Sequence, residues 1–189
     1  KDALLALAQK SNGVLSFLYP CGSYLLEGSP VMLIDVSGGE VPNELQEKIL
    51  AHLSINSEET IDHNFYYGFR QLTEVAVKAL SPGINDPGTA VQSMRALASL
   101  LAYRLLHFPD NVMKDQDGTV RIITKEASFE DLFQSCLLPV WDYGKEDRFI
   151  QKEMQHLLLQ LQAQRNHPAI RNLLAMVEKK MGEKRPGST

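Results

Sequence analysis

The sequence predicts an α+β protein, in which a small β-rich, barrel-sandwich-like N-terminal subdomain precedes a mainly α-helical subdomain with one short hairpin. Two observations lead to this prediction. Between residues 13 and 36, β-branched and aromatic residues gather between glycines and prolines, as they do in short strands. From residue 58 onward, apolar residues recur at three- and four-residue intervals, as on one face of a helix. The expected parts are residues 1–57, residues 58–182 and a disordered tail at 183–189.

The β-rich part is expected to carry a short helix at each end. Asp2 is suited to the start of the first helix, and Asn43 is the expected N-cap of the second. Glycine and proline interrupt the apolar runs between these helices, which separates the strands. The expected elements are a helix at Asp2–Gln9, a strand at Gly13–Pro20, a strand and turn at Tyr24–Pro30, a strand at Val31–Val36, and a helix at Asn43–Leu53.

Five amphipathic helices are expected in the second part. Gly68 inside the first of them costs about 1 kcal/mol relative to alanine, which indicates close packing there. Ser128 is an expected N-cap, followed by acidic residues in the first turn, where the helix dipole favours anions. The expected helices are Glu58–Leu80, Pro87–His107, Ser128–Tyr143, Glu146–Gln164 and Pro168–Met181, with a hairpin at Asn111–Thr124 around the residues DQDG.

Composition restricts the function classes. The formal net charge of the 189 residues is -4, which argues against a nucleic-acid partner, because such proteins usually present a basic face. Cys21 and Cys136 lie far apart without a CxxC motif and are expected to be buried free thiols. No apolar run reaches the ~18–20 residues of a membrane helix. Because the chain begins at Lys1 inside an amphipathic pattern, we expect it to be a fragment of a longer protein.

The least ordinary stretch is ALSPGINDPGTA, which links two expected helices. Pro82 disfavours helical geometry at Ser81, so the first helix is expected to end near Leu80. Pro87 suits the first position of the next helix, and Asp86 is then its N-cap. On this interpretation the stretch is a capped corner between two helices.

The same stretch also has the properties of a ligand site. A helix N-terminus with small residues exposes N–H groups and positive potential, which favours an anion, whereas Asp86 and Asn85 are oxygen ligands suited to a hard cation. The preceding helix adds charged groups, in which Arg70 and Glu74 are i,i+4 partners and Arg95 is expected nearby. Both interpretations stay open. The candidate ligand-binding residues are Arg70, Gln71, Glu74, Ser81, Asn85, Asp86 and Thr89.

The run YGFRQL at Tyr67–Leu72, with Ala76, ALSPGINDP at Ala79–Pro87 and Thr89–Ala90, resembles the domain-of-unknown-function 2254 family of bacterial predicted membrane proteins. The upstream stretch Pro20–Val31 is also similar to that family. There are departures from the family pattern. His63 and Asn64 stand where the family commonly has Gln-Asp, Glu74 where it has Asp, and Gly88 where it has an aromatic residue.

The resemblance implies that this chain is the soluble C-terminal portion of a bacterial inner-membrane protein. It implies a preceding membrane-spanning part of the same protein as a partner, and an orientation towards the cytoplasm. The family has no activity from which to infer a reaction. We therefore expect a module that binds a small anion or ion, or that assembles subunits as a homo-oligomer, and so regulates the membrane part.

Two alternatives remain. The first is a purely structural oligomerisation module, which is supported by the apolar stripes of the last two helices. The second is an enzyme, with His63 beside Asp62 as a general base. The sequence has no HExxH, GxSxG or P-loop motif, so no catalytic residue, metal ligand or cofactor is assigned.

Overall fold

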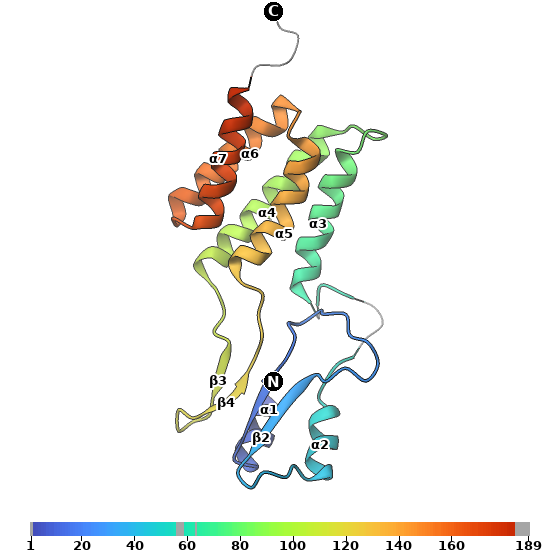
Figure 1. The fold of residues 1–189 in the computed structure, drawn as a ribbon, viewed down its shortest axis with the longest axis vertical. Coiled ribbons are helices and arrows are strands. Elements are labelled where there is room, and N and C mark those ends of the chain that lie inside the picture. Colours follow the sequence, from blue (N-terminus) through green and yellow to red (C-terminus); the bar gives the residue numbers. More distant parts are fainter. Residues whose placement is uncertain (1, 56–58, 63, 184–189) are drawn as a thin grey trace, which may run out of the picture. The chain divides into compact units, whose positions relative to one another are not determined.

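The structure is a computed structural model that describes residues 2–55, 59–62 and 64–183. The chain forms two compact units, and its α+β class is as predicted (Figure 1). The sheet unit consists of Lys1–Asn64 and Pro109–Ala127. The helical unit consists of Phe65–Phe108 and Ser128–Thr189. The predicted boundary between residues 57 and 58, and the predicted tail beyond residue 183, lie outside the described residues.

The sheet unit contains one four-stranded sheet with strand order β2-β1-β4-β3. β1 pairs with β2 antiparallel, from Gly13 opposite Val36 to Phe17 opposite Met32. On its other edge β1 pairs with β4 in parallel, and β4 pairs with β3 antiparallel. The elements are α1 (Asp2–Lys10), β1 (Gly13–Phe17), β2 (Met32–Val36), α2 (Asn43–Leu50), β3 (Val112–Lys114) and β4 (Val120–Ile123).

The hairpin β3–β4 belongs to this sheet, and the prediction that placed it in the helical part was wrong. Ile122 of β4 lies beside Leu15 of β1, and both side chains are about 1% exposed. Hairpin signals in a sequence are local, whereas the partner of the hairpin lies about a hundred residues earlier. The pairing follows from burying Ile122 against the same core as Leu15.

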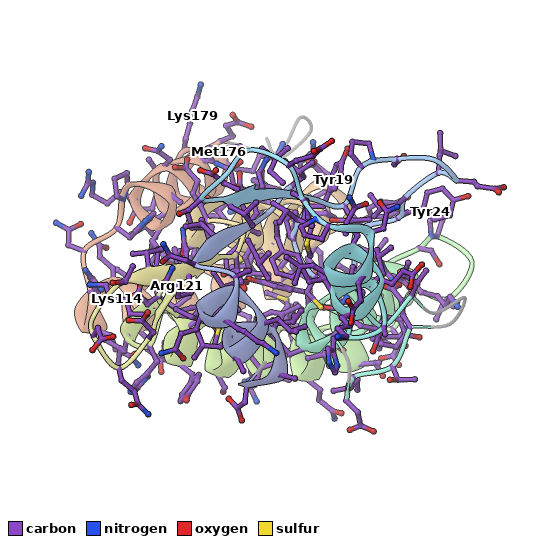
Figure 2. The ribbon with its side chains drawn as sticks, turned by 90° about the horizontal axis from the view of Figure 1, so that it is seen from below. Tyr19, Tyr24, Lys114, Arg121, Met176 and Lys179 are labelled. Atoms are coloured by element: carbon purple, nitrogen blue, oxygen red, sulfur yellow. The ribbon has the colours of Figure 1, made fainter. Side chains whose placement is uncertain are left out.

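The segment between β1 and β2 contains no strand at Tyr24–Glu27, where one was predicted. Gly22 and Gly28 both have φ near +80°, which turns the chain out of extended geometry on either side. Tyr19 and Tyr24, labelled in Figure 2, lie on this loop, and Tyr24 is 90% exposed. The unit is consequently an open sheet and not a small sandwich.

One face of the sheet packs against α1 and α2. Leu15 and Ile122 from the centre of the sheet meet Leu4 and Ala8 of α1 and Ile49 of α2. The second helix starts as predicted, but its N-cap position is Pro42, one residue earlier than expected. Its helical hydrogen bonds end early, so that the segment after Leu50 is a turn.

The helical unit is a five-helix assembly in which α4 packs on α3, α5 and α6 (Figure 1). The predicted helix from Glu58 begins only at Phe65, because the described residues before it form a turn and a loop. The other four helices agree with the prediction to within two residues. The elements are α3 (Phe65–Ala79), α4 (Pro87–Leu106), α5 (Phe129–Gly144), α6 (Arg148–Gln164) and α7 (Pro168–Gly182).

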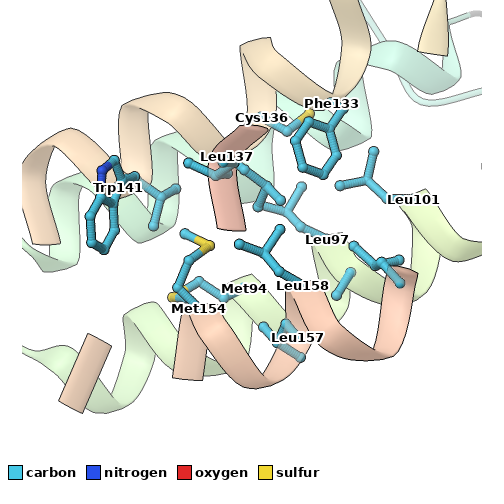
Figure 3. Packing of buried hydrophobic residues seen from close by; sticks show 14 of the residues in the cluster. Met94, Leu97, Leu101, Phe133, Cys136, Leu137, Trp141, Met154, Leu157 and Leu158 are labelled. Atoms are coloured by element: carbon cyan, nitrogen blue, oxygen red, sulfur yellow. The ribbon is translucent and has the colours of Figure 1, made fainter. Parts of the chain in front are cut away.

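Apolar side chains from α4, α5 and α6 converge in the core of this unit (Figure 3). Leu97, Leu101, Phe133, Met154 and Leu158 are each at most 1% exposed. Burial of side chains of this size stabilises a fold by about 1.5–3 kcal/mol each. The interior of the helical unit is thus a conventional apolar core.

Side-chain caps start four of these helices, including α7, where Nδ1 of His167 accepts the N–H of Ala169 at 3.2 Å. Asp86 accepts the N–H of Thr89 at α4, and Ser128 forms the predicted cap at α5 in a capping box with Asp131. Asp147 caps α6. Each cap satisfies N–H groups that have no partner within the helix. These caps explain why the boundaries of α4 to α6 were predictable.

Candidate functional site

The corner between α3 and α4, residues Leu80–Asp86, is held together by its own hydrogen bonds. The N–H of Asn85 donates to the carbonyl of Ser81 at 2.9 Å, and the N–H of Asp86 donates to the carbonyl of Ala79 at 2.8 Å. The hydroxyl of Ser81 donates to the carbonyl of Lys78 at 2.7 Å. Asn85 has φ +48°, the left-handed geometry that reverses the chain. Several backbone polar groups of the corner are therefore satisfied by neighbouring residues.

Asp86 acts as the cap that the sequence predicts. Its Oδ1 accepts the N–H of Thr89 at 3.1 Å, and its Oδ2 accepts the Thr89 hydroxyl. These two bonds lower the pKa of the Asp86 carboxyl, since they favour the charged form. Asn85 and Asp86 are exposed and Thr89 is half-buried. The carboxylate of Asp86 already occupies the N-terminus of α4, where an incoming anion was expected to bind.

Arg70, Gln71 and Glu74 lie on an exposed face of α3. Nε of Arg70 is 3.7 Å from Oε1 of Glu74, and the Arg70 guanidinium lies over the ring of Tyr67, 5.2 Å from its centroid. Along a helix that rises 1.5 Å per residue, Arg70 is about 13 Å from Ala79, where the helix ends. The three α3 candidates thus stand apart from the four candidates at the corner.

Arg95 was expected near Arg70 or Glu74, but it binds Glu153 of α6 instead. Its Nε and Nη2 donate to the two carboxylate oxygens at 2.7 and 3.1 Å, which is a bidentate pair. Donating these hydrogen bonds to Glu153 raises the pKa of Arg95. The Glu153 side chain is 11% exposed, whereas that of Arg95 is 61% exposed. The guanidinium therefore shields the carboxylate and presents its own outer edge to solvent.

This ion pair lies in a groove between α4 and α6 of about 310 Å³, which we call the α4–α6 groove. On the α4 side, the lining residues Ala98, Ser99 and Ala102 have small side chains, which leaves the groove open. On α6 four polar residues follow one another at intervals of three and four, which places them on one stripe of the helix. The lining consists of Arg95, Ala98, Ser99, Ala102, Glu153, His156, Leu157, Gln160, Leu161 and Gln164.

The groove combines an apolar floor with polar groups, as small-molecule sites do. Leu157 and Leu161 are buried beneath the exposed side chains of His156, Gln160 and Gln164. With Glu153 paired to Arg95, the side chains of His156, Gln160 and Gln164 can each donate and accept hydrogen bonds along the groove, whereas the Ser99 hydroxyl donates to the carbonyl of Arg95 at 3.0 Å. Sequence reasoning missed this site, because the alanines of α4 are typical of a buried helix face. The polar stripe on α6 was the one available signal.

Three other expectations concern reactive groups. The thiol of Cys136 is buried as predicted, but Cys21 is exposed, because it lies on the loop between β1 and β2. His63, the candidate base, lies outside the described residues. Within residues 2–55, 59–62 and 64–183, no three His, Cys, Asp or Glu side chains cluster as metal ligands would.

None of the described helices is both long enough and apolar enough to cross a membrane.

The fold defines an α+β protein with a sheet unit and a helical unit, each built from two separate segments of the sequence. The sequence model of the family described as "Predicted membrane protein (DUF2254)" matches residues 1–160. The chain belongs to this family of predicted membrane proteins.

Curated relatives are found in mycobacteria. An uncharacterized protein of Mycobacterium bovis, Mb1321c, is 30% identical over 123 residues, which is 64% of this chain. The uncharacterized protein Rv1290c of Mycobacterium tuberculosis has the same identity over the same length. The matched region is 23% of the length of each relative, so the chain spans about a quarter of them. No solved structure matches the chain.

Proposed function

We propose that this chain is a regulatory module of a membrane protein, that it faces the cytoplasm, and that its helical unit binds a small organic anion in the α4–α6 groove. Family membership supports the link to a membrane protein. The exposed thiol of Cys21 supports a reducing compartment, since exposed thiols persist there. Binding in the groove would regulate the membrane-spanning part by changing the packing of α4 against α6.

One observation carries the choice of ligand. Nε and Nη2 of Arg95 are engaged by Glu153, and Nη1 has no hydrogen bond among the described residues. Nη1 therefore offers two charged donors at one end of the groove, and the side-chain amides of Gln160 and Gln164 offer further donors along it. A carboxylate or phosphate monoester with a short apolar body would accept hydrogen bonds from these donors and would pack against the apolar floor of the groove.

The corner at Leu80–Asp86 is the competing site for the same class of ligand. The N–H groups of Ile84, Asn85 and Asp86 there, and that of Thr89 at the start of α4, are already bonded to oxygen atoms of neighbouring residues. A ligand there would have to displace the Asp86 carboxylate, whereas a ligand in the groove displaces only solvent. This difference favours the groove.

Thermal melts against a panel of anions test the proposal. The panel contains inorganic phosphate, phosphate monoesters, nucleotides, mono- and dicarboxylates, and metal ions for comparison. A ligand at 100 times its dissociation constant stabilises the folded chain by about 2.7 kcal/mol, which shifts the melting temperature measurably. We expect a shift with at least one organic anion.

Three variants locate the site. Arg95→Gln removes the charged donors, and Ser99→Leu fills the groove without touching the ion pair. Both should abolish the shift, whereas the corner variant Asn85→Gly should retain it. A shift that survives both groove variants and disappears in Asn85→Gly would move the site to the corner. If no anion shifts the wild type, the ligand-binding function is rejected.

An assembly function is the second candidate. It is favoured by a different observation, the uncovered face of the sheet unit.

A further inference from the structure

We propose that the uncovered face of the sheet unit pairs with the same face of a second copy of this chain. Residues alternate between the two faces of a strand. Ile34, Leu15, Ile122 and Met113 lie side by side across the four strands and belong to the core under α1 and α2. Their neighbours Leu33, Ser16, Ile123 and Val112 are also paired across the strands, and they point to the opposite side, which we call the open face.

The open face exposes apolar area. Leu33 is 60% exposed and Ile123 is 38% exposed, and Val14 and Val112 are half-buried. Strand residues of this kind on a solvated face are normally polar. The row Leu33, Ser16, Ile123 and Val112 is apolar on three of the four strands, which indicates a surface that is covered in the assembled protein.

Charges of opposite sign stand at the two edges of the sheet, and Lys114 follows a register shift between Met113 and Lys114. Asp35 is on β2 and Lys114 is at the end of β3, and the strand order places β2 and β3 at opposite edges. Three strand spacings separate them, which is about 14 Å. Within the described residues neither side chain forms an ion pair, whereas the neighbouring Arg121, labelled with Lys114 in Figure 2, is bound by Asp115.

This arrangement is self-complementary. A two-fold axis parallel to the strands lays each edge of one sheet over the opposite edge of the other. Asp35 then meets the partner's Lys114, and the same contact forms a second time by symmetry. Leu33 meets the partner's Val112 in the same way. The charge pattern thus selects a second copy, because the apolar row alone would accept any apolar partner.

The size of the face predicts a weak dimer. A strip about 14 Å wide and about 16 Å long, five residues at 3.3 Å each, covers roughly 200–300 Å². Stable complexes bury about 800 Å² per partner. Because the strip has about a third of that area, we expect the separate chain to dimerise weakly. Two copies held in one membrane would have a higher effective concentration and would pair more completely.

Sedimentation equilibrium of the 189-residue chain at concentrations up to ~1 mM and at low salt, where exposed charges are least screened, tests this. The wild type should show a monomer–dimer equilibrium. Leu33→Glu should abolish it, because a carboxylate would enter the apolar row. Leu26→Glu is the matched control, since Leu26 is 70% exposed but lies on the loop between β1 and β2, and it should leave the equilibrium unchanged.

A charge exchange tests the choice of partner. Asp35→Lys and Lys114→Glu should each weaken dimerisation roughly ten-fold, because each places like charges opposite one another. An equimolar mixture of the two variants should associate again, as should the double variant. Glu40→Lys, an exposed change outside the strands, controls for net charge.

Three results would overturn the proposal. The first is a wild type that stays monomeric at ~1 mM. The second is a dimer that Leu33→Glu and Asp35→Lys weaken no more than their controls do, which would place the interface elsewhere. The third is a failure of the two single variants to associate when mixed.

Discussion

Nε of Arg121 donates a 2.7 Å hydrogen bond to Oδ2 of Asp115, and both side chains are largely withdrawn from solvent. Oδ1 of Asp115 accepts the N–H groups of Asp117 at 3.0 Å and Thr119 at 2.9 Å. Nη1 of Arg121 reaches Oδ1 of Asn12, just before β1, at 2.9 Å. One carboxylate therefore shapes the β3–β4 turn and holds the arginine that ties this hairpin to β1.

We expect this pair to make the sheet unit sensitive to acid. The hydrogen bond from Arg121, and then those from the backbone of Thr119 and Asp117, lower the pKa of Asp115. A carboxyl whose pKa is lower when folded stabilises the protein above its unfolded pKa of about 3.9, and this contribution is lost as the pH falls through the folded value. Asp115→Asn should therefore lower the melting temperature at pH 7 by several degrees, and the deficit should shrink below about pH 4.

Melting curves from pH 7 down to about pH 2 check this expectation. Asp117→Asn is the matched control, because Asp117 is in the same turn and its side chain is exposed. It should change the melting temperature little at any pH. A deficit for Asp115→Asn that stays constant across the whole range would show that the ionised carboxylate is not what stabilises the turn.

The close approach at Gly144 gives a second prediction. A Cβ added at Gly144 would lie 2.5 Å from Cγ2 of Ile150 and 3.2 Å from Cδ1 of Leu80, so α6 would have to shift. Gly144→Ala should lower the free energy of unfolding by about 1–3 kcal/mol, the usual cost of overpacking. Urea denaturation measures it, with Gly83→Ala as the control, since a Cβ there meets nothing within 4 Å. Equal effects of the two substitutions would contradict the steric explanation.

Asn85 gives a third prediction, which separates the backbone role of the corner from its side chains. At φ +48° an alanine is strained and a glycine is not. Asn85→Ala should therefore destabilise the chain by about 1 kcal/mol, and Asn85→Gly should be close to neutral. Urea denaturation of both variants decides the matter. A loss of stability in both variants would assign a structural role to the amide side chain.

The parts of the fold that the sequence predicted are those that local chemistry determines. Asp86 and Ser128 were recognisable as caps because the N-cap position requires a side-chain acceptor next to free N–H groups. The partner strand of β4 was not predictable, because Ile122 and Leu15 meet only through the tertiary fold. The α4–α6 groove was not predictable for the same reason. Arg95 was recognised as a charged residue of interest, but its partner Glu153 lies 58 residues away.

The two cysteines give a last prediction. Cys21 is exposed, whereas Cys136 is 2% exposed, and burial raises the pKa of its thiol, which lowers the fraction of reactive thiolate. In the native chain a disulfide reagent such as dithionitrobenzoate should modify one thiol rapidly, and the second only after denaturation. In Cys21→Ser the rapid phase should disappear, and Cys136 should react at the rate of unfolding. Rapid labelling of Cys136 in native Cys21→Ser would mean that α5 separates from the core of the helical unit far more often than its packing against Thr73 and the surrounding apolar side chains implies.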